Sequence, residues 1–162
     1  MDFREAIDRF AIANLRPEDI PDIAVQALED GYDSPSLRRL AVAQGDYHLD
    51  IEDRFLKVLA ELKIPLPLPG EAAMSIARRV AANVINGTVE PIEGARELEK
   101  LWFAVYKHEQ QYPELGELAT FSGLVDVYDS VDTYEESESR KAEAREDYLR
   151  QTMDAFRRIL SG

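Results

Sequence analysis

The sequence predicts an all-α protein, built as a compact bundle of about six to seven helices. Apolar residues recur at the three- and four-residue spacing of an α-helix through nearly the whole chain, and no stretch alternates as a half-buried strand does. Proline and glycine stand where such helices would begin and end. At 162 residues the chain has the size of one ordinary domain, so we expect a single helical domain over residues 1–162.

Four helices are expected before residue 63. Pro17 stops the first, Gly31 gives the second a left-handed end, and Ser34-Pro35 is a start signal for the third. Asp50 precedes the fourth, whose apolar stripe includes Phe55 and Val58. The expected ranges are 2–15, 17–30, 35–44 and 51–62.

Residues 63–70 form the one clear internal connector, because Pro65, Pro67 and Pro69 alternate with apolar residues. Alternating prolines forbid a helix and favour an extended, polyproline-like segment. The spacing lacks the PxxP pattern with a flanking Arg that SH3-type domains bind, so we expect a connector and not a ligand.

The second half of the chain predicts helices over 71–86 and 91–110, a segment from Pro113, a break at Ser122-Gly123, and a last helix reaching Leu160. The helix after the break carries the apolar stripe Leu124, Val127, Val131 and Tyr134. Gly94 lies in the first turn of the 91–110 helix, where it costs about 1 kcal/mol relative to Ala. We therefore expect another helix to approach closely at Gly94.

Several chemistries are disfavoured, and we expect neither a cofactor nor a metal. The absence of Cys removes thiol nucleophiles, disulfides and Cys-based metal sites. Neither His48 nor His108 has a Glu, Asp or His at the spacing of the H-E-x-x-H or E-x-x-H metal motifs, and the glycines form no phosphate-binding loop. Asp126, Asp129 and Asp132 are spaced by three residues and not by the two of a calcium loop.

The composition predicts a cytoplasmic protein that binds neither membranes nor nucleic acid. The N-terminus lacks a signal-peptide layout, and no apolar run reaches the length of a membrane span. Residues 20–40 have the outline of a helix-turn-helix with Arg38 and Arg39 as readers. However, the net charge is −13, which opposes contacts with phosphate backbones.

The acidic excess is concentrated after His108, since no Lys or Arg occurs between Lys107 and Arg140. Helical periodicity places Asp126, Asp129 and Glu136 opposite the apolar stripe, with Tyr128 and Asp132 beside them. Tyrosine is common at interface hot spots, and a surface of one sign steers association. These five residues are the predicted binding site for a basic protein partner, as in an immunity protein, antitoxin or inhibitor.

One pattern resembles that of small, uncharacterised α-helical bacterial proteins. It comprises Asn86-Gly87, the run from Pro91 to Arg96, Trp102, and Leu118 with Phe121-Ser122-Gly123-Leu124. The resemblance covers about a quarter of the chain. It implies a bacterial-type cytosolic protein, and it brings no activity and no functional residue.

Two other classes of function stay open on the sequence alone. A small enzyme would use carboxylates with His108 as general base, oriented by Glu109 beside Tyr106. A structural homo-oligomer would be held by apolar helix faces, such as the small-residue face of the 71–86 helix. No catalytic residue is assigned.

Overall fold

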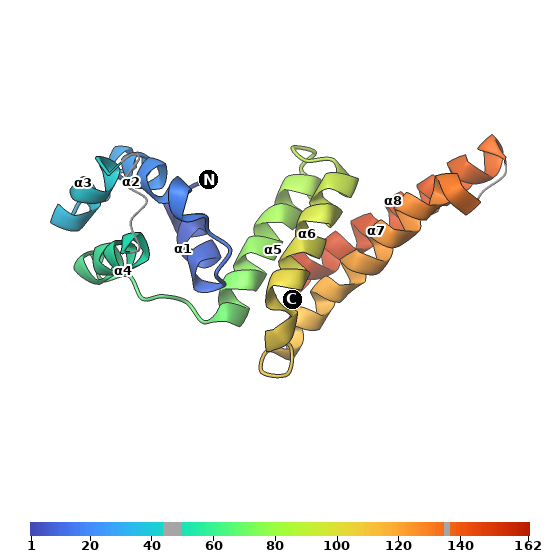
Figure 1. Ribbon diagram of the computed structural model, residues 1–162. Helices are drawn as coiled ribbons and strands as arrows, with labels where there is room; N and C mark the ends of the chain where they lie inside the picture. Colours follow the sequence, from blue (N-terminus) through green and yellow to red (C-terminus); the bar gives the residue numbers. More distant parts are fainter. Residues whose placement is uncertain (44–49, 135–136) are drawn as a thin grey trace. The chain divides into compact units, whose positions relative to one another are not determined.

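The computed structural model describes residues 1–43, 50–134 and 137–162 (Figure 1). Over these residues the chain is 79% helical, with eight α-helices and no strand, which confirms the all-α class. The predicted number of six to seven helices is therefore too low. The shortest of the eight is α3 (Pro35–Ala41), with seven residues.

The chain divides into two compact units, Met1–Ala72 and Ala73–Gly162, each with its own buried apolar side chains. The single domain over 1–162 stays a prediction. Within the described residues, no helix combines the length and the apolar character that crossing a membrane requires.

Unit 1 contains α1 (Phe3–Ala11), a 3₁₀ turn at Pro17–Asp19, α2 (Ile20–Glu29), α3 (Pro35–Ala41) and α4 (Ile51–Leu62). The start predicted at Ser34-Pro35 is confirmed, because the Ser34 hydroxyl accepts a hydrogen bond from the Leu37 amide at 3.2 Å. Helix α1 ends four residues earlier than predicted. Ala13 has φ 54°, in the left-handed region, and so ends the helical path before Leu15.

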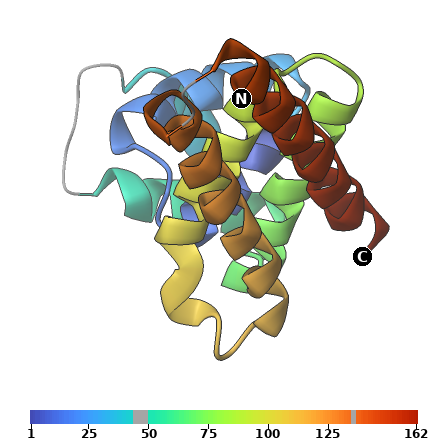
Figure 2. The same cartoon turned by 90° about the vertical axis from the view of Figure 1, so that its right-hand side faces the viewer.

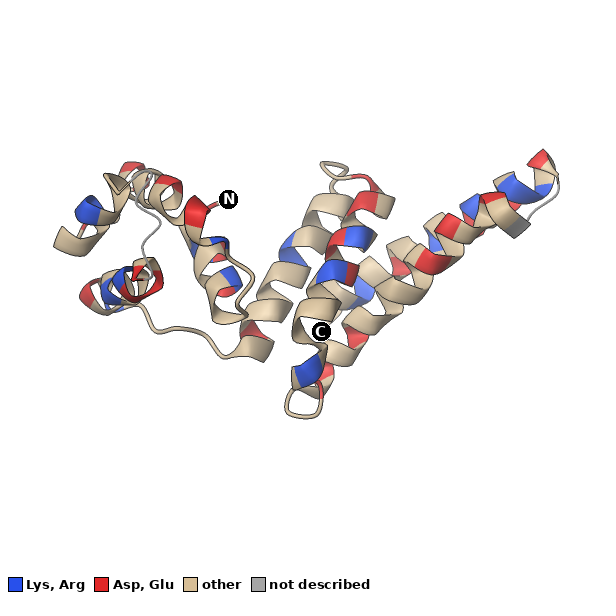
Figure 3. Cartoon of the chain, viewed as in Figure 1, with Lys and Arg blue, Asp and Glu red and all other residues tan. Residues whose placement is uncertain are grey.

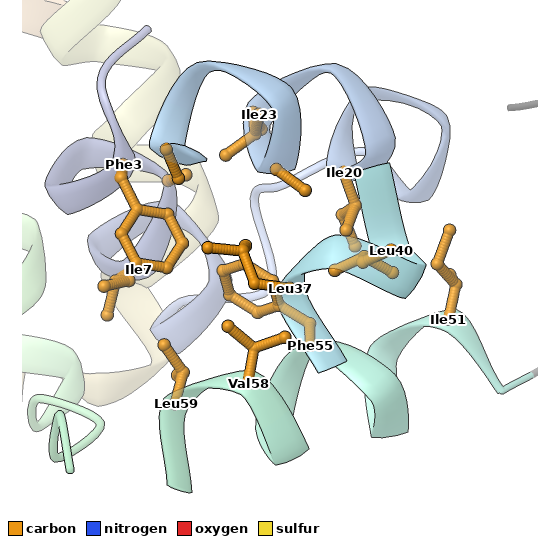
Figure 4. Packing of buried hydrophobic residues seen from close by; sticks show 13 residues of the cluster. Phe3, Ile7, Ile20, Ile23, Leu37, Leu40, Ile51, Phe55, Val58 and Leu59 are labelled. Atoms are coloured by element: carbon orange, nitrogen blue, oxygen red, sulfur yellow. The ribbon is translucent and has the colours of Figure 1, made fainter. Parts of the chain in front are cut away.

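The core of unit 1 is aromatic at its centre and aliphatic around it (Figure 4). The Phe55 ring lies 6.0 Å from that of Phe3 and 5.0 Å from that of Phe10, measured between centroids. Leu37 and Leu40 from α3 are buried against this centre. Burial of a large apolar side chain contributes about 1.5–3 kcal/mol, so these contacts hold the short α3 in place.

Lys63 has φ 57° and ends α4, and the chain is not helical from Ile64 to Leu68. Helix α5 (Pro69–Ile85) begins at the last of the alternating prolines, because proline is tolerated in the first turn of a helix. Unit 2 contains α5 from Ala73 onward.

The rest of unit 2 consists of α6 (Pro91–Val105), 3₁₀ turns at Tyr106–His108 and Pro113–Leu115, α7 (Gly116–Tyr134) and α8 (Glu138–Ser161). Helix α7 lies between α6 and α8 in contact with both, and α6 also touches α8 (Figure 2). The close approach predicted at Gly94 is confirmed. A Cβ there would lie 2.3 Å from Val84 Cγ2 and 3.0 Å from Phe156 Cζ.

The break predicted at Ser122-Gly123 is wrong, because α7 continues through both residues. Gly123 is exposed, and a Cβ at this position would meet nothing within 4 Å. On either side of it, Phe121, Leu124 and Val125 are buried. Their burial outweighs the roughly 1 kcal/mol that one glycine costs a helix.

Candidate functional site

The buried face of α7 differs from the predicted stripe. Val127 was expected to point inward but is 54% exposed, whereas Val125 is 3% exposed. The remaining buried residues of the helix are Leu118, Phe121, Leu124 and Val131. The face is broad because α7 packs against two helices and not one. The polar positions that flank this face therefore lie next to α6 and α8. Acidic residues at these positions can pair with basic residues of those helices.

Asp129 lies on the flank of α7 that faces α6. Its Oδ1 accepts from Arg96 Nη2 at 2.6 Å and its Oδ2 from Arg96 Nη1 at 3.3 Å. This two-pronged arrangement is the favoured geometry between an arginine and a carboxylate. Both side chains are partly exposed, so the pair contributes about 0.2–1 kcal/mol. Asp129 is thus neutralised locally by a residue from another helix.

Asp132 is neutralised from α8. Arg145 Nη2 lies 2.8 Å from Asp132 Oδ1, and Lys141 Nζ lies 3.9 Å from the same oxygen. Figure 3 shows Lys and Arg interspersed with Asp and Glu along α8. The sequence has no Lys or Arg between Lys107 and Arg140. In the fold, however, basic residues of α6 and α8 pair with the carboxylates of this interval.

Tyr128 faces inward. Its ring is half-buried and lies 4.8 Å from the ring of Tyr148, with 51° between the two planes. This is a packing contact between α7 and α8, so most of the ring is unavailable to a partner.

Asp126 is the predicted acidic residue that keeps its charge open to solvent. It is exposed and forms no hydrogen bond or ion pair with the described residues. Glu136, the fifth predicted residue, lies outside the residues that the structure describes. Asp126 thus differs from Asp129 and Asp132, which are both in ion pairs.

Two exposed aromatic rings lie at the end of α6 and directly after it, and the predicted partner-binding site included neither of them. Phe103 is 59% exposed and Tyr106 is 57% exposed, while Trp102 is half-buried beside Tyr106. The helix predicted over 91–110 would have included Tyr106. Instead, α6 ends at Val105, and Tyr106 is the first residue of the following 3₁₀ turn.

Phe103 and Asp126 lie on the same side of the α6–α7 pair. Phe103 follows Arg96 by seven residues, so both side chains leave α6 on nearly the same face. Arg96 binds Asp129 on the α6-facing flank of α7, and Asp126 precedes Asp129 by almost one turn. Tyr106 follows Phe103 by three residues, so the two rings are neighbours. We call Phe103, Tyr106 and Asp126 the aromatic–acidic face.

His108 lies in the 3₁₀ turn after α6 and is half-buried. Its backbone oxygen accepts from the Gln111 and Tyr112 amides, at 3.0 and 2.9 Å. Within the described residues, no hydrogen bond joins its ring to Glu109 or to another carboxylate. The orienting contact that a histidine general base needs is therefore not formed here.

Two polar side chains of α8 are buried without hydrogen bonds among the described residues, namely the hydroxyls of Tyr148 and Thr152. Burial raises the pKa of Tyr148, and the Thr152 hydroxyl one turn away opposes the rise without forming a well-oriented hydrogen bond. The described residues hold no group of three or more His, Asp or Glu side chains placed to bind a metal ion.

Sequence reasoning also missed a basic pocket of about 410 Å³ in unit 1, lined by Ser36, Arg39, Arg54 and Lys57. Arg54 and Lys57 are spaced as neighbours on one helix face, which is a visible signal. Their convergence with Arg39 depends on how α3 packs against α4, which sequence spacing does not show.

Comparison of the chain with protein-family models, with curated protein sequences and with solved structures gives no match. Functional inference therefore rests on the chain's own residues.

Proposed function

We propose that the chain is a non-enzymatic interaction protein that binds a basic protein partner through unit 2, in the manner of an immunity protein, antitoxin or inhibitor. The observation that carries this proposal is the pair of exposed aromatic rings, Phe103 and Tyr106, on the same side of unit 2 as the unpaired carboxylate of Asp126.

Exposed aromatic rings favour a binding role because their burial by a partner releases water from a large apolar area. Tyrosine and other aromatic residues are enriched at the centre of interfaces. Asp126 adds a charge that no described base neutralises, so a Lys or Arg of a partner would be attracted to it. Asp129 and Asp132 are already paired, so of the five residues expected from sequence the proposal keeps Asp126, and it adds Phe103 and Tyr106, which were not among them.

The proposal includes a cytoplasmic location and a partner that is not nucleic acid. Its support is the net charge of −13, which repels phosphate backbones and favours association with basic surfaces. The acidic excess also predicts that binding weakens as salt is added, because salt screens exposed charges.

Affinity capture from the native organism tests the proposal, with the immobilised chain washed at low and at high salt. We expect one predominant basic protein to be retained, and its retention to fall as salt rises. Phe103→Ser and Asp126→Lys should each reduce retention at least fivefold, about 1 kcal/mol of binding energy. Matched controls are Leu149→Ser, an exposed apolar residue of α8, and Glu143→Lys, an exposed carboxylate of the same helix.

Equal retention by Phe103→Ser, Asp126→Lys and their controls would contradict the proposal. Sedimentation of the purified chain tests the remaining alternative, in which the chain forms a homo-oligomer. If the aromatic–acidic face binds a second copy, wild type sediments as an oligomer and Phe103→Ser as a monomer, and the basic partner is then excluded as the occupant of this face.

A further inference from the structure

The basic pocket of unit 1 lies between α3 and α4 and is formed by two side chains from each helix. Ser36 and Arg39 come from α3, and Arg54 and Lys57 come from α4. In Figure 3, Lys and Arg are visible on both helices within a chain whose net charge is −13. Three cationic side chains thus converge on one cavity of a strongly acidic protein.

Helical spacing explains this arrangement. Ser36 and Arg39 are three residues apart on α3, and Arg54, Lys57 and Glu61 are three and four apart on α4, so each set shares one helix face. The adjoining faces of the two helices carry Leu37 and Leu40, and Phe55 and Val58, which are buried in the core of unit 1. The apolar core therefore fixes the direction in which the basic side chains point.

Glu61 fixes how the two helices are aligned. Its carboxylate accepts from the Ser36 amide at 2.9 Å and from the Ser36 hydroxyl at 2.6 Å. Both oxygens of the Glu61 carboxylate thereby bind Ser36, which lines the pocket. Lys57 lies close enough to help lower the pKa of Glu61, but forms no ion pair with it in the described structure.

Two of the three cations of the pocket have no ion-pair partner among the residues that the structure describes. Arg54 pairs with Asp50 at 3.0 Å, while Arg39 and Lys57 form no ion pair with the described residues. Like charges gathered in this way repel one another, and a bound anion removes that repulsion. Arg38, the neighbour of Arg39, differs because it is held by Asp33.

We propose that this pocket binds a compact small molecule carrying phosphate groups, such as a pyrophosphate or a phosphomonoester. The guanidinium groups of Arg39 and Arg54 each present paired donors that match phosphate oxygens, and Lys57 adds a point charge. A cavity of about 410 Å³ falls within the range of small-molecule sites. Three cations are too few to hold a nucleic acid against a net charge of −13, so the ligand is a single small anion.

Isothermal titration calorimetry of the full chain tests this inference, with inorganic phosphate, pyrophosphate and glycerol phosphate as probes at constant ionic strength. We expect saturable binding of at least one probe with a stoichiometry of one, and the preferred probe distinguishes free from organic phosphate. Arg39→Gln and Lys57→Gln should each weaken binding at least about tenfold, since each removes a charge-assisted contact.

Arg38→Gln is the matched control, because it removes the same charge from the same helix outside the pocket and should change affinity less than twofold. Circular dichroism confirms that each variant is folded. The inference is overturned if no probe binds saturably, or if Arg38→Gln weakens binding as much as Arg39→Gln. It is also overturned if a short oligonucleotide binds more tightly than every phosphate probe.

Discussion

Gly94 and Val84 lie so close together that a Cβ on Gly94 would stand 2.3 Å from Cγ2 of Val84. Phe156 Cζ lies on the same side, 3.0 Å from that position. Valine is stiff at χ1, so Val84 has little freedom to turn away. At this contact α6 lies so close to α5 that only a glycine, which has no side chain, fits at position 94.

Gly94→Ala should therefore destabilise the protein by about 1–3 kcal/mol, although alanine is the better helix former by about 1 kcal/mol. Gly123→Ala is the matched control, because Gly123 is also helical but faces open space. It should stabilise by about 0.5–1 kcal/mol. Urea unfolding of both variants measures the difference. Equal stabilisation by the two substitutions would show that Val84 moves aside freely.

The stability of unit 1 should depend on the protonation of Glu61. Hydrogen bonds from Ser36 lower the pKa of Glu61 to about 2, from an ordinary value of 4.5. Since the folded state favours the charged form, this contribution is complete above pH 4.5 and is lost as the pH falls toward 2. Unfolding of wild type and Glu61→Gln between pH 7 and pH 2 should show wild type more stable at neutral pH and the two converging in acid.

Glu143→Gln is the control for this titration, because Glu143 is an exposed carboxylate with no hydrogen bond in the described structure. Its curve should follow wild type throughout. A constant difference between wild type and Glu61→Gln at every pH would contradict the role given to the Glu61 charge.

Tyr148→Phe and Thr152→Val should each leave stability unchanged or raise it by up to about 1 kcal/mol. Both substitutions remove a buried hydroxyl that has no hydrogen bond among the described residues, and both keep the shape of the side chain. Thermal unfolding provides the measurement. A loss of more than about 1 kcal/mol in either variant would show that its hydroxyl has a partner in solution. Thr152→Ala should destabilise, since it leaves a cavity.

The Arg96–Asp129 pair should show a coupling energy of about 0.2–1 kcal/mol in a double-mutant cycle of Arg96→Gln and Asp129→Asn. The coupling should shrink at high salt. Asp126→Asn, on the same helix, should change stability by no more than about 0.5 kcal/mol and show no coupling to Arg96→Gln. If Asp126 couples to Arg96 as strongly as Asp129 does, both carboxylates interact with Arg96. Asp126 would then not be the unpaired carboxylate that the proposed function requires.

Local signals in the sequence predicted local structure well. The helix beginning at Ser34-Pro35 and the close approach at Gly94 follow from chemistry within a few residues. Gly123 shows the limit of this reasoning, because two glycines within helices look alike until their neighbours are known. The structure distinguishes the two glycines, because a Cβ on Gly94 would collide with Val84 whereas a Cβ on Gly123 would meet nothing within 4 Å.

The candidate site was harder to predict because its determinants are distant in sequence. The predicted site rested on the absence of bases between Lys107 and Arg140, but Arg96 and Arg145 reach Asp129 and Asp132 from other helices. The helix predicted to reach Gln110 ends at Val105, and the Tyr106 ring is exposed. Pairing across helices depends on packing, and a single sequence does not show it.

The bond between Glu61 and Ser36 bears on the order in which unit 1 acquires its structure. Helix α3 has seven residues, too few to persist alone in water. Its first turn is bound by a carboxylate from 25 residues further along the chain. Helix α3 therefore forms together with its docking onto α4 and not before it. A ribosome that has released the chain only as far as Ala41 holds a segment that is still coil, and this segment becomes helical when α4 emerges behind it.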